Sequence, residues 1–386
     1  GLLLALMAFT ACQTTEPGEA GPVTDQLPGQ RPSLNSDEAG LWMMMDRAEQ
    51  GLKTSGNLVR DKALNVYVQG IVCRLAGEYC PDIRVYVVRM PYFNASMAPN
   101  GVMQVWTGLI LRVKSEAQLS AVIGHEIGHY LRRHSLQMLR DVRNTTGFLV
   151  FFQLASAAAG VPEAGNIAQL ISVGSITGFS RDNEREADRV GLRLMVKAGY
   201  DPSQAAKVWG QLIREDEADE DKKFRSIFFA THPPPAERQE TLAALAENAA
   251  KNAKLGEIGA KRFHRITGPH RTGFLRDEMH LRRFSRAGEL LNILLEDGTK
   301  TGELKYFQGE IYRLRGEEGD VEKALKSYRA ALDDDGTPPE IHRSMALIYA
   351  RTGKTEKARA AYAKYLELRP DAEDRKMIEV LMKQLG

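Results

Sequence analysis

The chain has little that would suit it to bind nucleic acid or to cross a membrane. Its 52 basic and 50 acidic side chains leave a net charge of only +2 over 386 residues. No block of Lys and Arg stands out, so the electrostatic footprint of a nucleic-acid-binding protein is missing. Two apolar runs, Leu2 to Phe9 and Phe148 to Gly160, are too short to span a bilayer. The composition, 43% hydrophobic and 26% charged, is that of a globular protein of roughly two or three domains.

Cysteine is scarce, with three residues in the whole chain. Cys12 follows an apolar stretch with small residues and precedes a segment rich in Thr, Glu, Pro and Gly, which is typical of the end of a secretory signal. The sequence "FTAC" resembles a bacterial lipobox, although Phe9 stands where Leu is usual; a plain signal peptide is the alternative. We interpret residues 1–12 as the end of a signal peptide with lipidation at Cys12, and residues 13–35 as a flexible linker.

Export favours pairing of the other two cysteines, Cys73 and Cys80. On one continuous helix their Cα atoms would lie about 10 Å apart, whereas a disulfide needs them within roughly 7 Å. A disulfide therefore requires the helix that begins near Asp61 to end near Gly77, so that the chain turns back. Two free buried thiols are the alternative.

The middle of the chain carries both helical and strand patterns. Residues 36–76 are helical in pattern, and the stretches "IRVYVVRM" and "VMQVWTGLILRV" predict strands. The stretch between them, "PYFNASMAPNG", predicts a loop with a tight turn at Asn100-Gly101. From Ser115 onward the pattern returns to helix, and Phe148 to Gly160 is expected to be a buried helix or a lid that touches the membrane. We expect an α+β domain over residues 36–262, mostly helical with a small β-sheet.

The last third of the chain, residues 275–386, shows an internal repeat. Equivalent positions are Ala287, Leu291 and Leu294, then Ala324, Tyr328 and Ala331, then Ala358, Tyr362 and Tyr365; Gly309 and Tyr312 likewise match Ala346 and Tyr349. The spacing is 37 residues from the first unit to the second and 34 from the second to the third. This resembles tetratricopeptide repeats, which form an all-α solenoid with a concave protein-binding surface. A generic helical bundle is the alternative.

The stretch "AVIGHEIGHYLRRH" holds two histidines four positions apart, with a glutamate directly after the first. Ser115 and Gln118 form a capping box, so a helix is expected to begin just before this motif. On a helix His125 and His129 share one face, at the spacing that lets two imidazoles bind one tetrahedral zinc ion. Glu126 is rotated by about 100°, where it can take a proton from zinc-bound water. Two surface histidines on an ordinary helix are the alternative, which predicts no third ligand.

The stretch "FSRDNEREADRVG" contains a candidate for the third ligand. This stretch predicts a helix in which Glu184 and Asp188 share one face. Glu184 completes a two-His, one-Glu set that leaves a position for water, as catalytic zinc sites do. Asp188, one turn on, can accept the free N–H of a zinc-bound histidine and orient it. Glu186 is expected at the surface, and His134 is expected to be structural.

These motifs, together with "THPPPAER" at residues 231–238, resemble the minigluzincin zinc metalloproteases, the family that includes HtpX and the CAAX prenyl endopeptidases. The similarity covers roughly residues 36–262 and is greatest to the periplasmic, repeat-carrying branch of the BepA type. The fold that it implies is a zincin-like metalloprotease domain followed by the tetratricopeptide solenoid.

The resemblance also assigns roles. It implies that His125, His129 and Glu184 bind one Zn²⁺ per chain and that Glu126 is the general base. His232 would lie near the metal as a fourth ligand or a gate. Arg238 is a further candidate for contact with the ligands.

Substrate handling follows from the same class, in which an extended substrate chain pairs with an edge strand beside the zinc helix. The stretch "NASMAPNGVMQVWTG" is the expected edge strand with its preceding loop. Such binding is nearly independent of sequence, which suits unfolded or misassembled chains and requires a gate. His232 at the fourth metal position would be one gate, and the Phe148–Gly160 helix another.

The function implied is that of a zinc endopeptidase of the bacterial periplasm, to which there are two alternatives. The resemblance implies quality control of outer-membrane proteins, with attachment to the outer membrane through lipidated Cys12 and docking of the assembly machinery or its clients on the repeats. An assembly chaperone or scaffold with a mostly gated zinc site is one alternative. A zinc hydrolase that acts on a non-peptide bond is the other.

Overall fold

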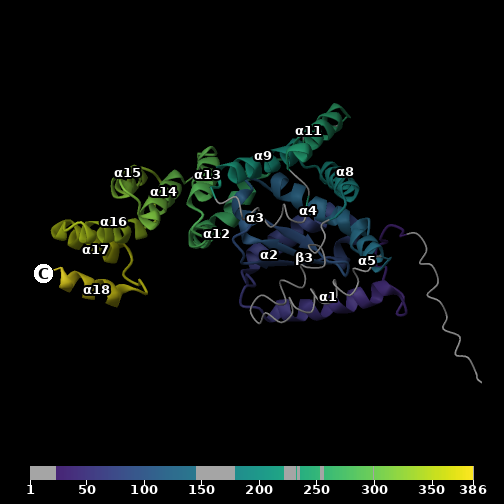
Figure 1. Ribbon diagram of the computed structural model, residues 1–386, viewed down its shortest axis with the longest axis horizontal. Coiled ribbons are helices and arrows are strands. Elements are labelled where there is room, and N and C mark those ends of the chain that lie inside the picture. The colour runs from purple at the N-terminus through teal and green to yellow at the C-terminus, as the bar shows by residue number, and fades with distance from the viewer. Residues whose placement is uncertain are drawn as a thin grey trace, which may run out of the picture.

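The structure is a computed structural model that describes residues 23–144, 179–220, 232, 235–252, 256–298 and 300–385. The predicted lipobox with Cys12, the first part of the predicted linker and the Phe148–Gly160 segment lie outside these residues. Figure 1 shows a mixed α/β part, from which a row of helices extends to the C-terminus. Within the described ranges, no helix is both long and apolar enough to cross a membrane.

The β-sheet is small and has three strands in the order β1-β3-β2. Strand β1 (Arg84–Val88) runs parallel to β3 (Val102–Trp106), and β2 (Ala95–Met97) pairs antiparallel with β3. The turn between β2 and β3 contains Gly101 at φ 85°, where a Cβ would lie 2.1 Å from the carbonyl oxygen of Asp82. Only glycine fits this turn, which fixes β2 at the edge of the sheet.

Two of the strand predictions were wrong in detail. The expected strand over residues 102–113 ends at Trp106, and Thr107–Arg112 form helix α3. Every residue of α3 is buried, and a continuous apolar run does not distinguish a buried strand from a buried helix. The expected loop, in turn, contains β2. The edge of the sheet is therefore β2, and β3, which was expected at the edge, is central.

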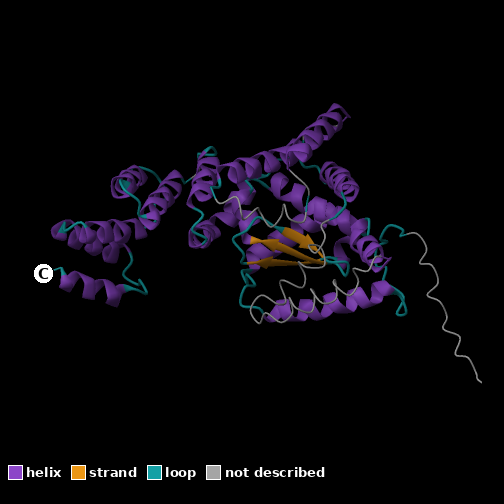
Figure 2. Cartoon of the chain, viewed as in Figure 1, coloured by secondary structure: helices purple, strands orange, loops and turns teal. Residues whose placement is uncertain are grey.

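Helices cover both faces of the sheet (Figure 2). Helix α1 (Asp37–Thr54) packs its apolar face, including Leu41 and Met45, on Val102 and Trp106. Helix α2 (Lys62–Ala76) and helix α4 (Glu116–Leu131) share a second hydrophobic core with the opposite side chains of the strands. The alternation of side chains along β3 thus buries both of its faces, and it places α4 directly against the sheet.

The predicted turn after α2 is present. The helix ends at Ala76, Gly77 follows at φ 58°, and a 3₁₀ helix runs over Gly77–Asp82. Cys73 and Cys80 are joined by a disulfide with their Cα atoms 4.6 Å apart. The glycine allows the chain to reverse, which brings the two cysteines within the distance that a disulfide needs.

Among the described residues, four more helices belong to the first part of the molecule. They are α5 (His134–Asn144), α8 (Arg181–Lys197), α9 (Ser203–Ala218) and α11 (Pro235–Asn252). Helices α8 and α9 both pack on α4, and α11 packs on α8 and α9. The helix that carries "HEIGH" is therefore enclosed by the sheet on one side and by the later helices on the other.

The C-terminal part is all-α, as the repeat predicts. Its helices are α12 (Ala260–His280), α13 (Phe284–Leu295), α14 (Thr301–Arg315), α15 (Asp320–Leu332), α16 (Glu340–Arg351), α17 (Thr355–Leu368) and α18 (Arg375–Gln384). The nine equivalent positions on α13, α15 and α17 are all buried. In the second unit a Cβ on Gly309 would lie 2.3 Å from the ring of Tyr328. A small residue thus lets the aromatic side chain pack between paired helices, which confirms the reason for the repeat.

The two parts are joined by one continuous helix. Helix α12 runs through residues 263–274, the stretch that the sequence assigned to neither domain. Its C-terminal half packs in the same hydrophobic core as α3 and α9.

Candidate metal centre

Helices α4 and α8 approach each other closely because glycines line their contact. A Cβ on Gly128 would lie 2.8 Å from the carbonyl oxygen of Ala187, and one on Gly191 would lie 2.7 Å from the backbone nitrogen of His125. Neither position has room for a larger residue. The close approach brings the "HEIGH" turn of α4 directly against the first turns of α8.

Four potential metal ligands converge at this contact. They are His125, His129, Glu184 and His232, whose ligand atoms all lie within 4.8 Å of one another. The Nε2 atoms of His125 and His129 are 3.0 Å apart, and Glu184 oxygens lie 3.4 Å and 3.3 Å from these two nitrogens. His232 Nδ1 is 2.7 Å from Glu184 Oε1. All four side chains are buried.

The donor set fits a zinc ion. Three imidazoles and one carboxylate are ligands that zinc prefers, and four donors match its tetrahedral geometry. One carboxylate oxygen, Glu184 Oε2, is buried and makes no hydrogen bond among the described residues. A buried carboxylate oxygen without a hydrogen bond is costly, and a bound cation would remove that cost. With His232 turned away, the other three ligands would leave one position for water.

Glu126 lies beside this cluster without belonging to it. Its carboxylate is buried, its Oε1 is 3.8 Å from Nε2 of His232, and the backbone of Met97 in β2 hydrogen-bonds to it. Burial raises the pKa of Glu126 to about 7. A carboxylate with such a pKa can both accept and release a proton near neutral pH.

A second layer of charges holds the ligands in place. Asp188 Oδ1 is 2.9 Å from Nδ1 of His125, so Asp188 can accept the N–H of that imidazole. Arg238 on α11 donates two hydrogen bonds to Asp188, and its guanidinium lies 4.0 Å above the ring of Trp209. Arg238 Nη1 also lies 3.3 Å from Glu184. Removal of Arg238 would therefore leave two buried carboxylates less well compensated.

The pKa values of the carboxylates suit metal binding. Burial acts to raise the pKa of Glu184, but His232 and His125 outweigh it and hold the pKa well below its usual range. Burial likewise opposes ionisation of Asp188, yet Arg238 and His125 lower its pKa to about 2. Both side chains are therefore anionic at neutral pH, the state in which a carboxylate binds metal or orients a ligand.

The histidines respond to the same charges in opposite directions. Burial and Arg238 act to lower the pKa of His125, but Glu184 and Asp188 raise it to about 9. Burial lowers the pKa of His129 well below its usual value. An imidazole binds zinc in its neutral form, so metal binding at neutral pH must displace a proton from His125 and none from His129.

His134 makes a contact that its place in the sequence did not predict. This side chain is fully buried, and its Nδ1 is 2.9 Å from Nδ1 of His129. Its other nitrogen, Nε2, is 3.4 Å from Glu186, which also pairs with Arg132. When Nε2 of His129 faces a metal, its Nδ1 carries the proton and donates it to His134, which in turn donates to Glu186. His134 was expected to be structural and Glu186 to be at the surface. Both instead belong to a series of hydrogen bonds that orients the metal ligand His129.

A spacing in the sequence could have indicated this contact. His134 follows His129 by five residues, and Arg133 between them adopts a left-handed conformation at φ 52°. That residue ends α4 and turns the first residue of α5 back toward the motif. A helical count alone does not predict such a return, because it assumes that the helix continues.

Replacing His134 by alanine is expected to weaken zinc binding by roughly 10–100-fold, because His129 would lose the acceptor that fixes its ring. Zinc affinity is measured by competition with a chromophoric chelator. His342→Ala, which removes a half-buried histidine from the repeats, is the matched control and should leave the affinity unchanged. Equal affinity of His134→Ala and the parent would contradict an orienting role.

Comparison with known proteins finds two family matches in this chain. The family described as peptidase family M48 matches residues 59–246, and the tetratricopeptide repeat matches residues 313–373. The first range contains all four residues of the metal cluster together with Glu126, Asp188 and Arg238. The second contains the whole of α15, α16 and α17.

Individual relatives match about half of the chain or less. The chain is 34% identical over 178 residues to the mitochondrial metalloendopeptidase OMA1 of Schizosaccharomyces pombe, which covers 45% of this chain and 50% of that protein. It is 34% identical over 162 residues to the protein of the same name from Arabidopsis thaliana, covering 41% and 30%. It is 27% identical over 228 residues to the beta-barrel assembly-enhancing protease of Escherichia coli, covering 55% and 46%. The chain thus spans half or less of the length of these relatives.

Proposed function

We propose that this chain, which carries a peptidase family M48 domain followed by a tetratricopeptide repeat, is a zinc-dependent endopeptidase. The observation that carries the proposal is the convergence of His125, His129 and Glu184 on one point, with the carboxylate of Glu126 beside it. The relatives named above are a metalloendopeptidase and a protease. The metal in this family is zinc, and the donor set described above suits that ion.

The residues of the metal centre would have different roles in peptide hydrolysis. His125, His129 and Glu184 would hold the ion, which supplies Lewis acidity when bound. Glu126 takes the proton of the attacking water and returns it to the leaving nitrogen, a role that suits its pKa of about 7. Asp188 keeps the imidazole of His125 in the orientation that ligation needs.

The substrate proposed is an extended polypeptide. Among the described residues, strand β2 has one neighbour, β3, so its other edge can hydrogen-bond to an added strand. The backbone of Met97 in this strand reaches Glu126, so a chain paired with β2 would pass close to the general base. Main-chain pairing is nearly independent of sequence, which suits unfolded or misassembled proteins.

The setting proposed is the bacterial periplasm, with outer-membrane proteins as clients. The E. coli relative is named for beta-barrel assembly, and the disulfide between Cys73 and Cys80 suits an oxidising compartment. The peptidase domain would extend over residues 36–262 and the repeats over residues 275–386, where assembly machinery or clients would dock. A lipid on Cys12 would attach the protein to the outer membrane.

The proposed activity is tested by metal analysis combined with hydrolysis of unfolded casein. One zinc ion per chain and cleavage that a zinc chelator abolishes are the expected results. Cell-wall fragments serve as the second substrate in the same assay. Zinc-dependent cleavage of the fragments without cleavage of casein would replace the endopeptidase with a hydrolase of a non-peptide bond.

One contact favours a second function, that of a chaperone whose zinc site is mostly closed. His232 lies 2.7 Å from Glu184 and 3.4 Å from His125, so it can occupy the fourth ligand position that water needs. A gated site of this kind would bind clients more often than it cleaves them.

Replacing His232 by alanine is expected to raise the rate of casein hydrolysis by up to about tenfold. This is the rise expected if His232 leaves the fourth ligand position free in about a tenth of the molecules. The rate is measured at saturating zinc, because the variant also loses one ligand. His342→Ala, which removes a half-buried histidine on α16, is the control for loss of an imidazole. A fall in the rate instead of a rise would favour a direct part for His232 in the reaction.

A further inference from the structure

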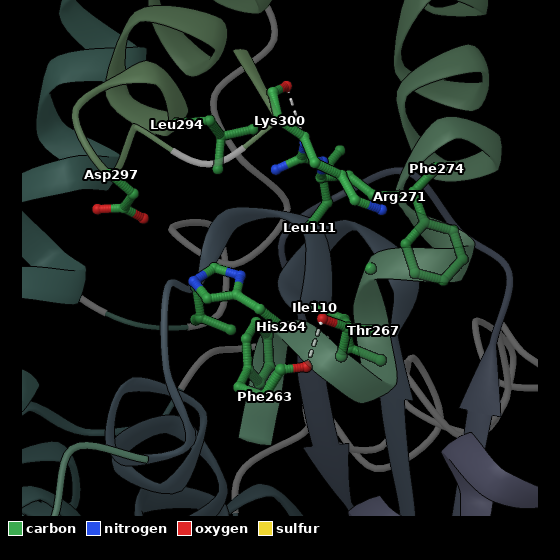
Figure 3. Close-up of a pocket in the computed structure, with 12 residues that line it drawn as sticks. Ile110, Leu111, Phe263, His264, Thr267, Arg271, Phe274, Leu294, Asp297 and Lys300 are labelled. Carbon is green, nitrogen blue, oxygen red and sulfur yellow. Dashed lines mark hydrogen bonds between the residues drawn. The ribbon is translucent and has the colours of Figure 1, made fainter. Parts of the chain in front are cut away.

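A cavity of about 160 Å³ lies where the repeats meet the first part of the molecule (Figure 3). Its walls come from three segments: α3 with the residue after it, helix α12, and the connection from α13 to α14. The lining residues are Ile110, Leu111, Val113, Phe263, His264, Thr267, Gly268, Arg271, Phe274, Leu294, Asp297 and Lys300. None of them belongs to the metal cluster or to β2.

The size and lining of the cavity restrict what it can hold. Six of the lining residues are aliphatic or aromatic, which makes most of the wall apolar. Pockets for drug-sized ligands and cofactors are larger, about 300–1,000 Å³, whereas an apolar cavity of about 150 Å³ is known to hold one benzene molecule. The space therefore suits a single aromatic or branched side chain and is too small for a nucleotide.

Lys300 is an exposed cation among the residues that line this cavity. Its backbone is left-handed, at φ 46° and ψ 53°, a conformation that a lysine rarely adopts. Arg271 donates a hydrogen bond to the carbonyl oxygen of Lys300. The Cβ of Lys300 lies 3.1 Å from the position that a Cβ on Gly336 would occupy. The ammonium lies across α12, 3.9 Å from the position of a Cβ on Gly268. Residues on both sides thus hold the lysine in this strained conformation.

The other charges around the cavity have partners, and the ammonium of Lys300 does not. Arg271 pairs with Glu303 at 2.6 Å, and Asp297 pairs with Lys114 at 3.3 Å. Within the described ranges, no carboxylate forms an ion pair with Lys300. An apolar hollow beside one uncompensated cation is complementary to a ligand that has an apolar group next to a single negative charge.

We propose that this cavity binds the C-terminal residue of a polypeptide, with its apolar side chain inside and its carboxylate at the ammonium of Lys300. The proposal rests on the proposed function, because a peptidase meets chain ends both in its clients and in its products. A chain terminus places a carboxylate one carbon from the side-chain stem, which matches a cation at the rim of a hollow for one side chain. A client held here would contact the peptidase part through α3 and the repeats through α12 at the same time.

Two substitutions test recognition of the carboxylate and of the apolar side chain separately. Lys300→Gly removes the cation and suits the left-handed backbone, so it should not weaken the fold. Gly268→Leu fills the cavity from a helical position at which a Cβ meets nothing except Lys300. Arg282→Gly is the matched control, because Arg282 is also a cation in a left-handed conformation, at φ 55°, and does not line the cavity.

The probe is a fluorescent pentapeptide, Ala-Ala-Ala-Ala-Phe, with either a free carboxylate or an amide at its end. Binding is measured by fluorescence anisotropy in the Glu126→Gln background, so that no cleavage is needed for the readout. We expect the free acid to bind about tenfold or more tightly than the amide, as is typical of a hydrogen bond to a charged group. Lys300→Gly should abolish this difference, Gly268→Leu should abolish binding of both peptides, and Arg282→Gly should change neither.

Several outcomes would overturn the proposal. Equal affinity for acid and amide, loss of the difference in Arg282→Gly, or the absence of binding would each do so. Displacement of the peptide by a fatty acid, with no preference for the free peptide carboxylate, would assign the cavity to an acyl chain instead. A protein that binds the acid peptide but does not cleave casein would refute the proposed function and leave this site standing.

Discussion

Replacing Glu126 by glutamine is expected to lower the rate of casein hydrolysis by roughly 10²–10⁴-fold, the contribution of a positioned general base. The amide of glutamine has nearly the shape of the carboxylate but cannot accept the proton of the attacking water. Because Glu126 lies beside the ligands and is not one of them, the variant should still bind one zinc ion per chain. The rate is measured on purified protein at saturating zinc, together with its zinc content.

The zinc content of the Glu126→Gln variant distinguishes loss of the general base from loss of the metal. A variant that loses both activity and metal would show that Glu126 supports the ligands, and would leave its part in proton transfer without support. Glu322→Gln, an exposed glutamate on α15, serves as the control for the chemical change. In cells, a Glu126→Gln protein that performs every function of the parent would favour the chaperone over the peptidase.

The pairing of candidate ligands on each helix could be predicted from local spacing, whereas the packing of α4 on α8 brings the two helices together. His125 and His129 are four positions apart, as are Glu184 and Asp188, so each pair shares a helix face. The structure has the first pair 3.0 Å apart and brings Glu184 within 3.4 Å of both histidines. The position of His232 came from resemblance, because a histidine before three prolines has no helical spacing that would direct it to the site.

What the sequence did not predict depends on contacts between distant segments. The run over residues 102–113 was expected to be a strand throughout, and Thr107–Arg112 became a buried helix because tertiary packing decides between two structures that the same apolar run allows. Asp188 was expected to orient a histidine, but its two hydrogen bonds from Arg238, 50 residues later, follow only from the packing of α11 on α8.

The joint between the two parts illustrates the same point with buried charge. Arg112 on α3 is 2% exposed and lies 2.8 Å from Glu215 on α9 and 2.8 Å from Glu278 on α12. Arg286 on α13 lies 3.3 Å from the same oxygen of Glu215. Burial acts to lower the pKa of Arg112, but the two glutamates outweigh it and raise the pKa above its ordinary value. Two cations and two anions from four helices thus neutralise one another where the first part of the molecule meets the repeats.

Replacing Arg112 by methionine is expected to lower the free energy of unfolding by about 3–5 kcal/mol, the usual effect of removing one partner from a buried ion pair. Methionine fills much of the same volume, so the loss comes from the ion pairs and from the hydrogen bonds that Arg112 donates to the carbonyl oxygens of Pro91 and Gly108. Arg286 remains beside Glu215, whereas Glu278 loses its only ion-pair partner among the described residues. The measurement is urea unfolding followed by tryptophan fluorescence, to which Trp209 on α9 contributes.

Two further variants assign the loss to the uncompensated anion. Arg214→Met removes an exposed cation that joins α9 to Glu289 and Glu296 across the same joint, and it should cost less than about 1 kcal/mol. Adding Glu278→Gln to Arg112→Met should restore much of the lost stability, because a neutral amide is less costly to bury than an unpaired carboxylate. If the double variant is as unstable as Arg112→Met alone, the loss comes from packing. If it recovers, the loss comes from the buried anion, and the charges from α3, α9, α12 and α13 hold the repeats to the part that carries the metal centre.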